Sequence, residues 1–407
     1  MKLPKLRIDL HWQILIALVL SVFYGVFFKD HIHYVSWIGV LFLRALNMTI
    51  IPLVLSSIIS GVANIGSAEN LGKLGLKTFG FYIITSLLAI LTGQFLVNVL
   101  KPGVGVDLNL AQEAGPAGTV SSIWNTLLEI IPSNVFGALS NNGSMLAVIF
   151  FAILFGYFIT RVGDRHSQVL KELFTAIFEV MMKITLVIIR FAPLGIFGLV
   201  AEKISQQDNL IALMQSMGFY MIIVLFGIAF HLLVTFSLIL KFTGGIHPWR
   251  HLKAMRTPLI TAFSTASSNA TLPLTMEAVE DKAGVSNKIS AFVLPLGATV
   301  NMNGTALYEC VAVIFIAQAY GIDLSFMQQA TIALTALLAA IGSAGIPMAG
   351  LVMMTLILNA VGLPLEGIGL ILAVDRILDM FRTMLNVYGD TCGAVIIAKS
   401  EGETLKV

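Results

Sequence analysis

Charge is scarce in this sequence. Lys, Arg, Asp and Glu make up only 11% of the 407 residues, whereas 57% are hydrophobic, and the mean hydropathy is +0.92. A soluble domain carries about 25% charged residues, so the composition excludes a soluble globular protein and predicts a polytopic membrane protein. The net charge is only +2 and the basic residues are spread over loops, which argues against nucleic acid as a partner.

Cysteine is also scarce. The two cysteines, Cys310 and Cys392, fall in apolar segments. We therefore interpret them as small core residues, and not as a disulfide, a metal site or a redox pair. The first apolar segment, 14–28, has no cleavage site of small residues and is followed by further apolar segments. We expect it to remain in the protein as a transmembrane span, and not to be removed as a signal peptide.

Six apolar segments precede residue 241. We interpret them as spans near 11–28, 34–60, 79–100, 120–160, 170–201 and 210–240. The fourth span should be bent or divided, because Pro132 and the segment 141–144 interrupt it. Basic residues in the loops alternate between two sides, and Lys2, Lys5 and Arg7 place the N-terminus in the cytoplasm by the positive-inside rule.

Two stretches of the C-terminal part, 257–276 and 324–365, contain no charged residue. Their centres, 263–273 and 341–350, are nevertheless polar and contain proline. Non-helical backbone at membrane depth is tolerated only where protein buries it or where it lines a wet cavity. Both stretches are therefore predicted to be re-entrant hairpins. Since each precedes a span with a polar interruption, the pattern indicates an inverted repeat with a binding site between its halves.

The last apolar segment carries the densest set of polar residues in the chain. At 3.6 residues per turn, they share a helical arc of roughly 120°: Asp375, Arg376, Asp379, Arg382, Thr383, Asn386 and Asp390. Each charge at membrane depth costs on the order of 2.5–3.5 kcal/mol unless it is paired or hydrated. The alternative, a solvated face of a peripheral helix, fits poorly because the flanks are apolar. The stripe predicts a site for a small zwitterionic molecule.

These residue types define what the site could bind. Arg382 can hold a carboxylate through a bidentate hydrogen bond, and Asp379 can hold an ammonium group one turn away. Exposed backbone N–H groups at the hairpin tips can hold a second carboxylate, so the set describes an acidic amino acid. Two alternatives stay open: Arg382 could only pair with Asp375 or Asp379, and Asp390 could pair with a loop lysine instead of binding a cation.

Four motifs carry a family resemblance: 267–273, 301–305, 342–347, and 379–386 together with Asp390. With them, the sequence resembles the dicarboxylate/amino acid:cation symporter family, which has the glutamate transporter fold. A weaker similarity runs through 82–86. The resemblance implies an all-α polytopic membrane protein with eight transmembrane helices, two re-entrant helical hairpins and inverted repeats. It also implies a homotrimer in the cell membrane with both termini cytoplasmic.

The resemblance divides the chain into two regions. Residues 1–248 would form mainly the scaffold and trimerisation region, through spans 1, 2, 4 and 5, while spans 3 and 6 would join a mobile transport domain. Residues 249–407 would form the transport core. Its parts are hairpin 1 at about 249–283, span 7 at about 285–320, hairpin 2 at about 325–360 and span 8 at about 366–400.

The resemblance also assigns the substrate-binding residues. Arg382 and Thr305 would hold the side-chain carboxylate of the substrate, and Asp379 its amino group. Asn386 and the hairpin tips would hold the main-chain carboxylate, and Thr383 would add a neutral hydrogen bond. The expected substrate-binding residues are Ser267, Ser268, Thr305, Gly345, Ile346, Asp379, Arg382, Thr383 and Asn386.

Sodium sites follow from the same resemblance. One would use Asp390 with carbonyl groups of Gly297, Asn301 and Asn386. A second would use carbonyl groups of Thr299, Ala340, Ile341 and Ser343. A third would use Tyr82, Thr85, Ser86, Asn301 and an aspartate at position 303.

This sequence departs from the sodium-coupled pattern at position 303, where it has Asn303. Asparagine brings no negative charge, so the third sodium ion is in doubt. Glu309 stands at a position where proton-moving relatives tend to have an acid, and a buried carboxyl suits a proton carrier. The alternative for Glu309 is a protonated core residue that is hydrogen-bonded to a neighbour.

The function expected from these observations is secondary active symport of glutamate or aspartate, driven by protons or sodium ions, with no cofactor. A C4-dicarboxylate carrier is the first alternative, but Asp379 would repel a substrate without an ammonium group. A neutral amino acid carrier would leave Arg382 buried without a partner. A channel would need polar residues along whole spans, and an intramembrane enzyme would need a nucleophile with a base or a metal cluster, so neither is expected.

Overall fold

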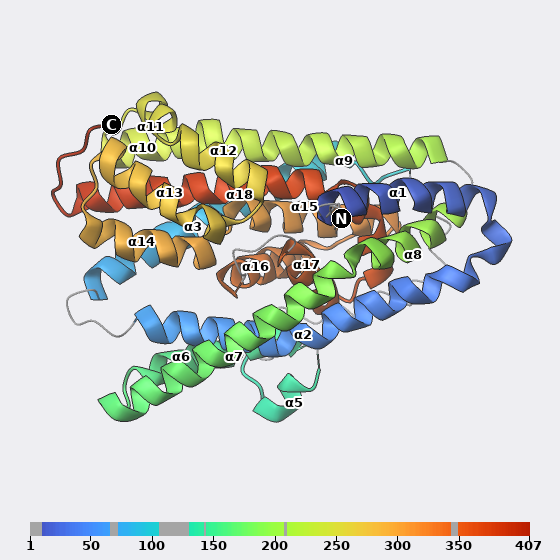
Figure 1. Cartoon of the computed structure of the whole chain (residues 1–407), viewed down its shortest axis with the longest axis horizontal. Helices are drawn as coiled ribbons and strands as arrows, with labels where there is room; N and C mark the ends of the chain where they lie inside the picture. The colour runs from blue at the N-terminus through green and yellow to red at the C-terminus, as the bar shows by residue number, and fades with distance from the viewer. Residues whose placement is uncertain (1–9, 66–71, 106–129, 142–143, 207–209, 343–348) are drawn as a thin grey trace, which may run out of the picture.

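The computed structural model describes residues 10–65, 72–105, 130–141, 144–206, 210–342 and 349–407. Within these ranges the chain is helical and contains no β-strand. The helices form an elongated bundle (Figure 1). The all-α class predicted from the sequence is therefore confirmed for the described part of the chain.

Four described segments are long and apolar enough to cross a membrane. The bent pair of helices α7 (Asp164–Arg190) and α8 (Ala192–Ser205) makes a fifth when it is counted as one span. The four are His33–Ala63, Lys73–Leu100, Ile211–Gly244 and Asn287–Ala319. Two shorter apolar helices, Trp12–Phe27 and Ala147–Ile159, coincide with predicted spans 1 and 4. The count of eight requires these two and the charged last helix to cross as well, and it stays a prediction.

The N-terminal helices pack mainly on one another. Helix α1 (Leu10–Phe27) lies along α8 (Ala192–Ser205), and α2 (His33–Ile65) lies against α6 (Met145–Ile159), α7 (Asp164–Arg190) and α8. The short helix α5 (Val135–Leu139) covers part of α6. In Figure 1, α2, α6 and α7 run along the lower part of the bundle, and α1 and α8 lie toward its right end.

The predicted fifth span, 170–201, is not straight. Helices α7 and α8 meet at Phe191 at an angle of 53°, and Pro193 lies at the start of α8. A proline has no backbone N–H to continue the preceding helix but fits the first turn of a new one. The bend therefore has a local cause in the sequence.

A second group surrounds α15 (Asn303–Ala319), which contacts α3 (Gly72–Leu100), α9 (Leu210–Phe230) and α18 (Ile368–Ser400). Helix α9 continues through a π-helical turn, His231–Thr235, into α10 (Phe236–Gly244). Helix α18 contacts both α9 and α14 (Asn287–Val300) and runs along the bundle between them (Figure 1). Cys310 and Cys392 are both buried here as core residues.

Both predicted hairpin segments are pairs of packed helices. After α11 (Pro248–Ala254), α12 (Arg256–Thr265) packs against α13 (Ser268–Glu277), which ends in the π-helical turn Ala278–Ala283. Ala266, between α12 and α13, has a φ of +49° and reverses the chain. Helices α16 (Phe326–Gly342) and α17 (Ala349–Val361) also pack together. Their connection, 343–348, lies outside the described residues.

Residues 401–407, which we call the C-terminal strap, run back from the end of α18. Glu403 Oε2 accepts a hydrogen bond of 2.9 Å from the backbone N–H of Ser286, and the N–H of Lys406 donates to the carbonyl of Ala283 at 2.9 Å. Glu401 forms an ion pair with Lys77 of α3, with 2.5 Å between Oε1 and Nζ. The hydrogen bond from Lys77 lowers the pKa of Glu401 below its usual range. The strap thus joins three separate segments.

Candidate substrate and ion site

The interruption between α14 and α15 lies next to α18. Asn301 and Met302 leave the helical conformation, with ψ angles of 76° and 54°. Gly304, just inside α15, is so close to α18 that a Cβ atom there would lie 2.6 Å from the carbonyl oxygen of Arg382. The Gly304 N–H donates to Asn386 Oδ1 at 2.7 Å. Glycine is required for this close approach.

The guanidinium group of Arg382 is fully buried at the centre of α18. Its Nη2 lies 2.8 Å from Asp379 Oδ1 and 3.1 Å from Asp375 Oδ1. Nε and Nη1 have no hydrogen-bond partner among the described residues. Nη1 faces Gly350 of α17, where a Cβ atom would lie only 3.0 Å away. The two N–H groups of Nη1, on the side of Gly350, are therefore available for a carboxylate.

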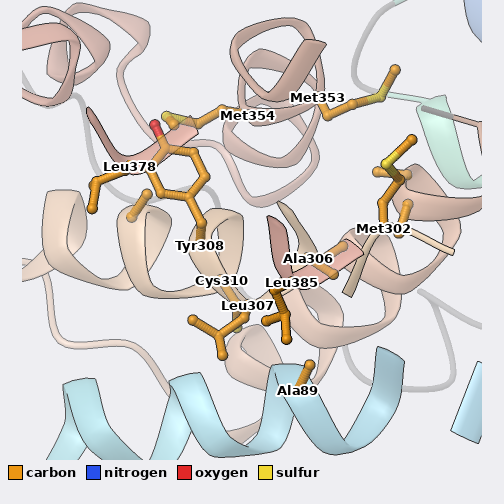
Figure 2. Packing of buried hydrophobic residues seen from close by; sticks show 14 of the residues in the cluster. Ala89, Met302, Ala306, Leu307, Tyr308, Cys310, Met353, Met354, Leu378 and Leu385 are labelled. Atoms are coloured by element: carbon orange, nitrogen blue, oxygen red, sulfur yellow. The ribbon is translucent and has the colours of Figure 1, made fainter. Parts of the chain in front are cut away.

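Tyr308 of α15 holds this guanidinium group from one face. The carbon Cζ of Arg382 lies 3.7 Å from the centre of the Tyr308 ring, a cation–π contact. The Tyr308 hydroxyl donates to Asp375 Oδ1 at 2.6 Å. Figure 2 shows Tyr308 rising from α15 toward Met354 and Leu378, while Leu307 and Leu385 lie toward Ala89 of α3. The charged cluster is thus enclosed by apolar packing.

The remaining polar residues of α18 line the same site. Asp379 Oδ2 lies 3.4 Å from Arg376 Nη1, and Thr383 donates to the backbone carbonyl of Asp379 at 2.8 Å. Asn386 Nδ2 lies 3.2 Å from Thr305 Oγ1 on α15. The structure therefore brings together Thr305, Asp379, Arg382, Thr383 and Asn386, and their role in substrate binding stays a prediction. Both ion pairs considered for Arg382 are present.

The first hairpin brings its turn to α18. Both α12 and α13 contact α18, and Phe263 of α12 stacks edge-on against Phe381, with 4.9 Å between ring centres. Ser267 is the N-cap of α13, where its Oγ accepts a hydrogen bond from the N–H of Ala270 at 3.2 Å, and Ser268 is buried. The partner positions expected in hairpin 2, Gly345 and Ile346, lie outside the described residues.

Asp390 lies against the interruption, one end of its carboxylate facing Asn301. Asn301 Nδ2 donates to Asp390 Oδ1 at 2.8 Å, and Gly297 of α14 lies directly beside that oxygen. Asp390 is buried and has no ion pair within the described part of the chain. Pairing of Asp390 with a loop lysine is thus not seen among the described residues, and the carboxylate lies next to Asn301 and Gly297, two of the three residues expected to share a sodium ion with it.

Asn303 faces α3. Ser86 Oγ donates to Asn303 Oδ1 at 2.6 Å, so the oxygen expected to bind a third ion already has a partner. Thr85 donates to the carbonyl of Phe81 at 2.9 Å, and Tyr82 donates to that of Val293 at 2.9 Å. These three hydroxyl groups donate their protons, and their oxygen lone pairs remain available. Asn301 Oδ1 has no partner among the described residues.

The expected second sodium site falls where two helices end. Thr299 lies in the last turn of α14 and Ala340 in the last turn of α16, and these helices contact each other. The last four carbonyl groups of a helix have no partner within it, so both residues can offer a carbonyl oxygen. Ile341 also lies in the last turn of α16, and Ser343 is outside the described residues.

Glu309 is buried completely, next to Tyr308 on α15. Neither carboxyl oxygen has a hydrogen-bond partner among the described residues. The alternative of a core residue that is hydrogen-bonded to a neighbour is therefore not seen there. Burying a charge without a partner is costly, which makes Glu309 a candidate to bind and release a proton.

Sequence reasoning missed three parts of the site: the ring of Tyr308, Gly304 and Gly350. A signal existed for Tyr308, because it lies one turn after Thr305 on the same helix face. Glycines that let two helices approach depend on tertiary contacts, and nothing in their local sequence singles them out. Asp375 was considered only as an ion-pair partner, and the structure shows it bound to both Arg382 and Tyr308.

A helical membrane protein with a compensated charge cluster between an interrupted helix and two hairpins has the features of a secondary transporter. Residues 10–400 match the family model described as sodium:dicarboxylate symporter family. The chain therefore belongs to this family and is a multi-pass membrane protein.

Its relatives come from bacteria and animals. The proton/glutamate-aspartate symporter of Escherichia coli (strain K12) is 34% identical, over 98% of this chain and 94% of the relative. The proton/sodium-glutamate symport protein of Bacillus caldotenax is 36% identical, over 98% and 96%. An excitatory amino acid transporter of Caenorhabditis elegans is 38% identical, over 90% and 82%. All three are named as transporters or symport proteins.

Proposed function

We propose that this protein is a symporter that moves glutamate or aspartate into the cell, coupled to protons, sodium ions or both. The observation that carries this proposal is Arg382, whose buried guanidinium group keeps two N–H donors free beside the carboxylate of Asp379. The names of the relatives support the same substrate class.

Charge balance in the site supports an acidic amino acid. Without substrate, Arg382 is shared by Asp375 and Asp379. The side-chain carboxylate of the substrate would accept hydrogen bonds from Nη1 of Arg382, and its ammonium group would bind Asp379. The hairpin turn at Ser267 and Ser268, together with Asn386, would hold the main-chain carboxylate through neutral hydrogen bonds. The side-chain carboxylate and the ammonium group then each have a partner of opposite sign.

A C4-dicarboxylate is the second candidate substrate. The contact between Asp379 and Arg376, at 3.4 Å, partly compensates the charge that would otherwise repel such a molecule. Arg376 is partly exposed, so its compensation is weakened by solvent. We therefore rank the amino acid first, and competition with succinate distinguishes the two.

Sodium ions are proposed to bind at the two places where oxygen atoms gather. Asp390, with carbonyl groups of Gly297, Asn301 and Asn386, would hold one. The carbonyl groups at the ends of α14 and α16, from Thr299, Ala340, Ile341 and Ser343, would hold another. Oxygen ligands of these kinds suit hard cations. Asn303 brings no negative charge to the third site, which supports fewer than three sodium ions.

The packing supports a division into two parts, of which one would move relative to the other. Helices α3, α9 and α10 pack with the C-terminal elements, as expected for spans 3 and 6, while α1, α2 and α6–α8 form the other group. We propose that the N-terminal group of α1, α2 and α6–α8 is the scaffold of a homotrimer. The group around α15 and α18 would move across the membrane by alternating access, with both chain ends in the cytoplasm.

The test is uptake into proteoliposomes loaded with potassium buffer, with the sodium gradient and the pH gradient imposed separately. Uptake of labelled aspartate or glutamate that needs one of these gradients, and that tenfold excess succinate leaves largely unchanged, is the expected result. Equal inhibition by succinate and by unlabelled aspartate would favour the dicarboxylate, and uptake without any gradient dependence would contradict symport.

A further inference from the structure

Helix α11 separates two grooves on the surface of the second group. The α10 groove, of about 620 Å³, lies between α11 and the end of α9–α10 and is lined by Leu232, Leu233, Lys241, Ile246 and Tyr388. The α12 groove, of about 480 Å³, is lined by Arg256, Leu259, Ile260, Phe263, Phe381 and Met384. Trp249 and Leu252 of α11 line both grooves. They form a ridge between two apolar channels.

Basic residues surround this ridge. Lys241 belongs to the α10 groove, Lys253 and Arg256 belong to the α12 groove, and Arg250 lies next to Trp249. All four are exposed. None forms an ion pair or hydrogen bond with another described residue, although Lys241 lies 6.0 Å from the Phe242 ring centre. Their charges are available to an external ligand.

The acidic residues nearest in the fold do not compensate these charges. The π-helical turn Ala278–Ala283 packs against α11 and carries Glu280 and Asp281. Glu280 accepts hydrogen bonds from Asn287 and Ser290 on α14. No carboxylate of the described chain lies within ion-pair distance of the four cations. The region is therefore a net positive rim above apolar floors.

The chemistry of the rim and floors fits one kind of molecule. In a bilayer, an apolar surface channel is occupied by acyl chains, and basic pockets at the ends of transmembrane helices attract anionic headgroups. Trp249 is 68% exposed, and tryptophan prefers the level of the headgroups. A phospholipid has two chains and one phosphate, which matches two grooves that share one ridge.

We propose that this surface binds one anionic phospholipid, with an acyl chain in each groove and the phosphate against Lys241, Lys253 and Arg256. The positive-inside rule assigns these cations to the cytoplasmic leaflet, where anionic lipids are enriched in many cells. The site lies on α11 and α12, which lead directly to Ser267. If the proposed function holds, the lipid is bound to the part of the transporter that moves.

The experiment measures lipid contact at Trp249 directly and does not depend on transport. The chain has four tryptophans, and replacing Trp12, Trp37 and Trp124 by phenylalanine leaves Trp249 as the single fluorophore. The protein is reconstituted into vesicles of phosphatidylcholine that contain increasing fractions of brominated phosphatidylcholine or of brominated phosphatidylglycerol. Bromine quenches tryptophan on contact. We expect phosphatidylglycerol to quench at about a tenfold lower mole fraction.

Three further proteins sharpen this test. The triple variant K241Q/K253Q/R256Q should lose the preference for phosphatidylglycerol, while quenching by phosphatidylcholine persists. Arg165→Gln, an exposed cation at the start of α7, should keep the full preference. A protein with Trp37 as its only tryptophan should show none. Equal quenching by both lipids at Trp249, or a preference that survives in the triple variant, would overturn the proposal.

Discussion

Two long apolar segments of this protein differ in hydropathy and in the share of their residues that the protein buries. The most apolar window of α9–α10 has a mean hydropathy of 2.6, and only 39% of it is buried inside the protein. The corresponding window of α14–α15 has a mean hydropathy of 1.4, and all of it is buried. The less apolar window is therefore the one that the protein encloses.

The difference follows from the solvent. Lipid chains are as apolar as a protein core, so a lipid-facing helix must be apolar outside, whereas an internal helix can carry polar groups if its neighbours satisfy them. Helix α15 uses that freedom: Asn303, Thr305, Tyr308 and Glu309 all lie within it, and each is buried. Polar residues in an otherwise apolar span therefore mark the internal surface, where transported molecules can bind.

The largest expected effect comes from Arg382→Ala, which removes the cation that α15 encloses. Loss of one partner of a buried ion pair costs about 3–5 kcal/mol, so we expect aspartate affinity to fall by more than about a hundredfold. Isothermal titration calorimetry in detergent measures this change. Arg376→Ala, on the same helix but partly exposed, is the matched control and should cost less than about tenfold. Unchanged affinity in Arg382→Ala would refute the substrate assignment.

The next effect compares the same substitution in both segments. Gly304→Ala in α15 should lower the free energy of unfolding by about 1–3 kcal/mol, because the new Cβ would lie 2.6 Å from the Arg382 carbonyl oxygen. Gly218→Ala in α9 meets no atom within 4 Å and should stabilise by about 0.5–1 kcal/mol. Thermal unfolding midpoints in one detergent give both values. Equal shifts would show that α9 and α15 are packed alike.

Asp390→Asn tests the proposed sodium site at Asp390. The substitution keeps the size of the side chain and removes its charge, so the sodium dependence of aspartate binding should weaken by about tenfold. Binding titrations at several sodium concentrations provide the measurement, and Asp281→Asn on the exposed turn should behave like the parent protein. If Asp390→Asn retains the parent sodium dependence, Asp390 has a structural role and the ion binds elsewhere.

Glu309→Gln examines the unpartnered acid of α15. Glutamine imitates the protonated carboxyl but cannot release a proton, so the pH dependence of uptake should flatten to within about twofold between pH 5.5 and 8, while aspartate still binds. Glu366→Gln, at an exposed acid, should leave the pH profile unchanged. The same profile in Glu309→Gln and the parent would show that protons, if coupled, travel through another group.

Asn303→Asp should have the smallest effect. The new carboxylate would supply a negative charge next to Ser86, and we expect the Hill slope for sodium to rise by less than one unit. Asn303→Ala removes the hydrogen bond to Ser86 without adding charge and serves as the control. An unchanged slope in Asn303→Asp would mean that charge at position 303 does not decide how many ions bind.

Much of the fold follows from the sequence because its signals are local. Apolar runs predict α2 and α9–α10 to within about five residues and the end of α3, which begins seven residues before the predicted span. The polar run 301–305 predicts the interruption between α14 and α15. The bend at Phe191 was not predicted, although Pro193 indicates it, because 170–201 was interpreted as one continuous span. The π-helical turn at His231–Thr235 leaves no local signal of this kind.

The candidate site also has a part that local sequence signals predict and a part that depends on tertiary contacts. Residues on α18 could be grouped by helical spacing alone, which is why Asp379, Arg382, Thr383 and Asn386 were predicted together. The ring of Tyr308 over Arg382 depends on how α15 crosses α18, a tertiary property that spacing along one helix cannot give. The choice of Asp375 as a second partner of Arg382 likewise depends on the Tyr308 hydroxyl that orients it.

The C-terminal strap has a consequence for the order of events during synthesis. Glu403 bonds to Ser286 across 117 residues, so the junction between hairpin 1 and α14 leaves the ribosome long before its partner exists. At about 5–20 residues per second, the wait is roughly 6–23 seconds. During that interval α14, α15, both arms of the second hairpin and α18 must emerge. The C-terminal strap can form its hydrogen bonds only after these helices have been synthesised, so its attachment follows their synthesis.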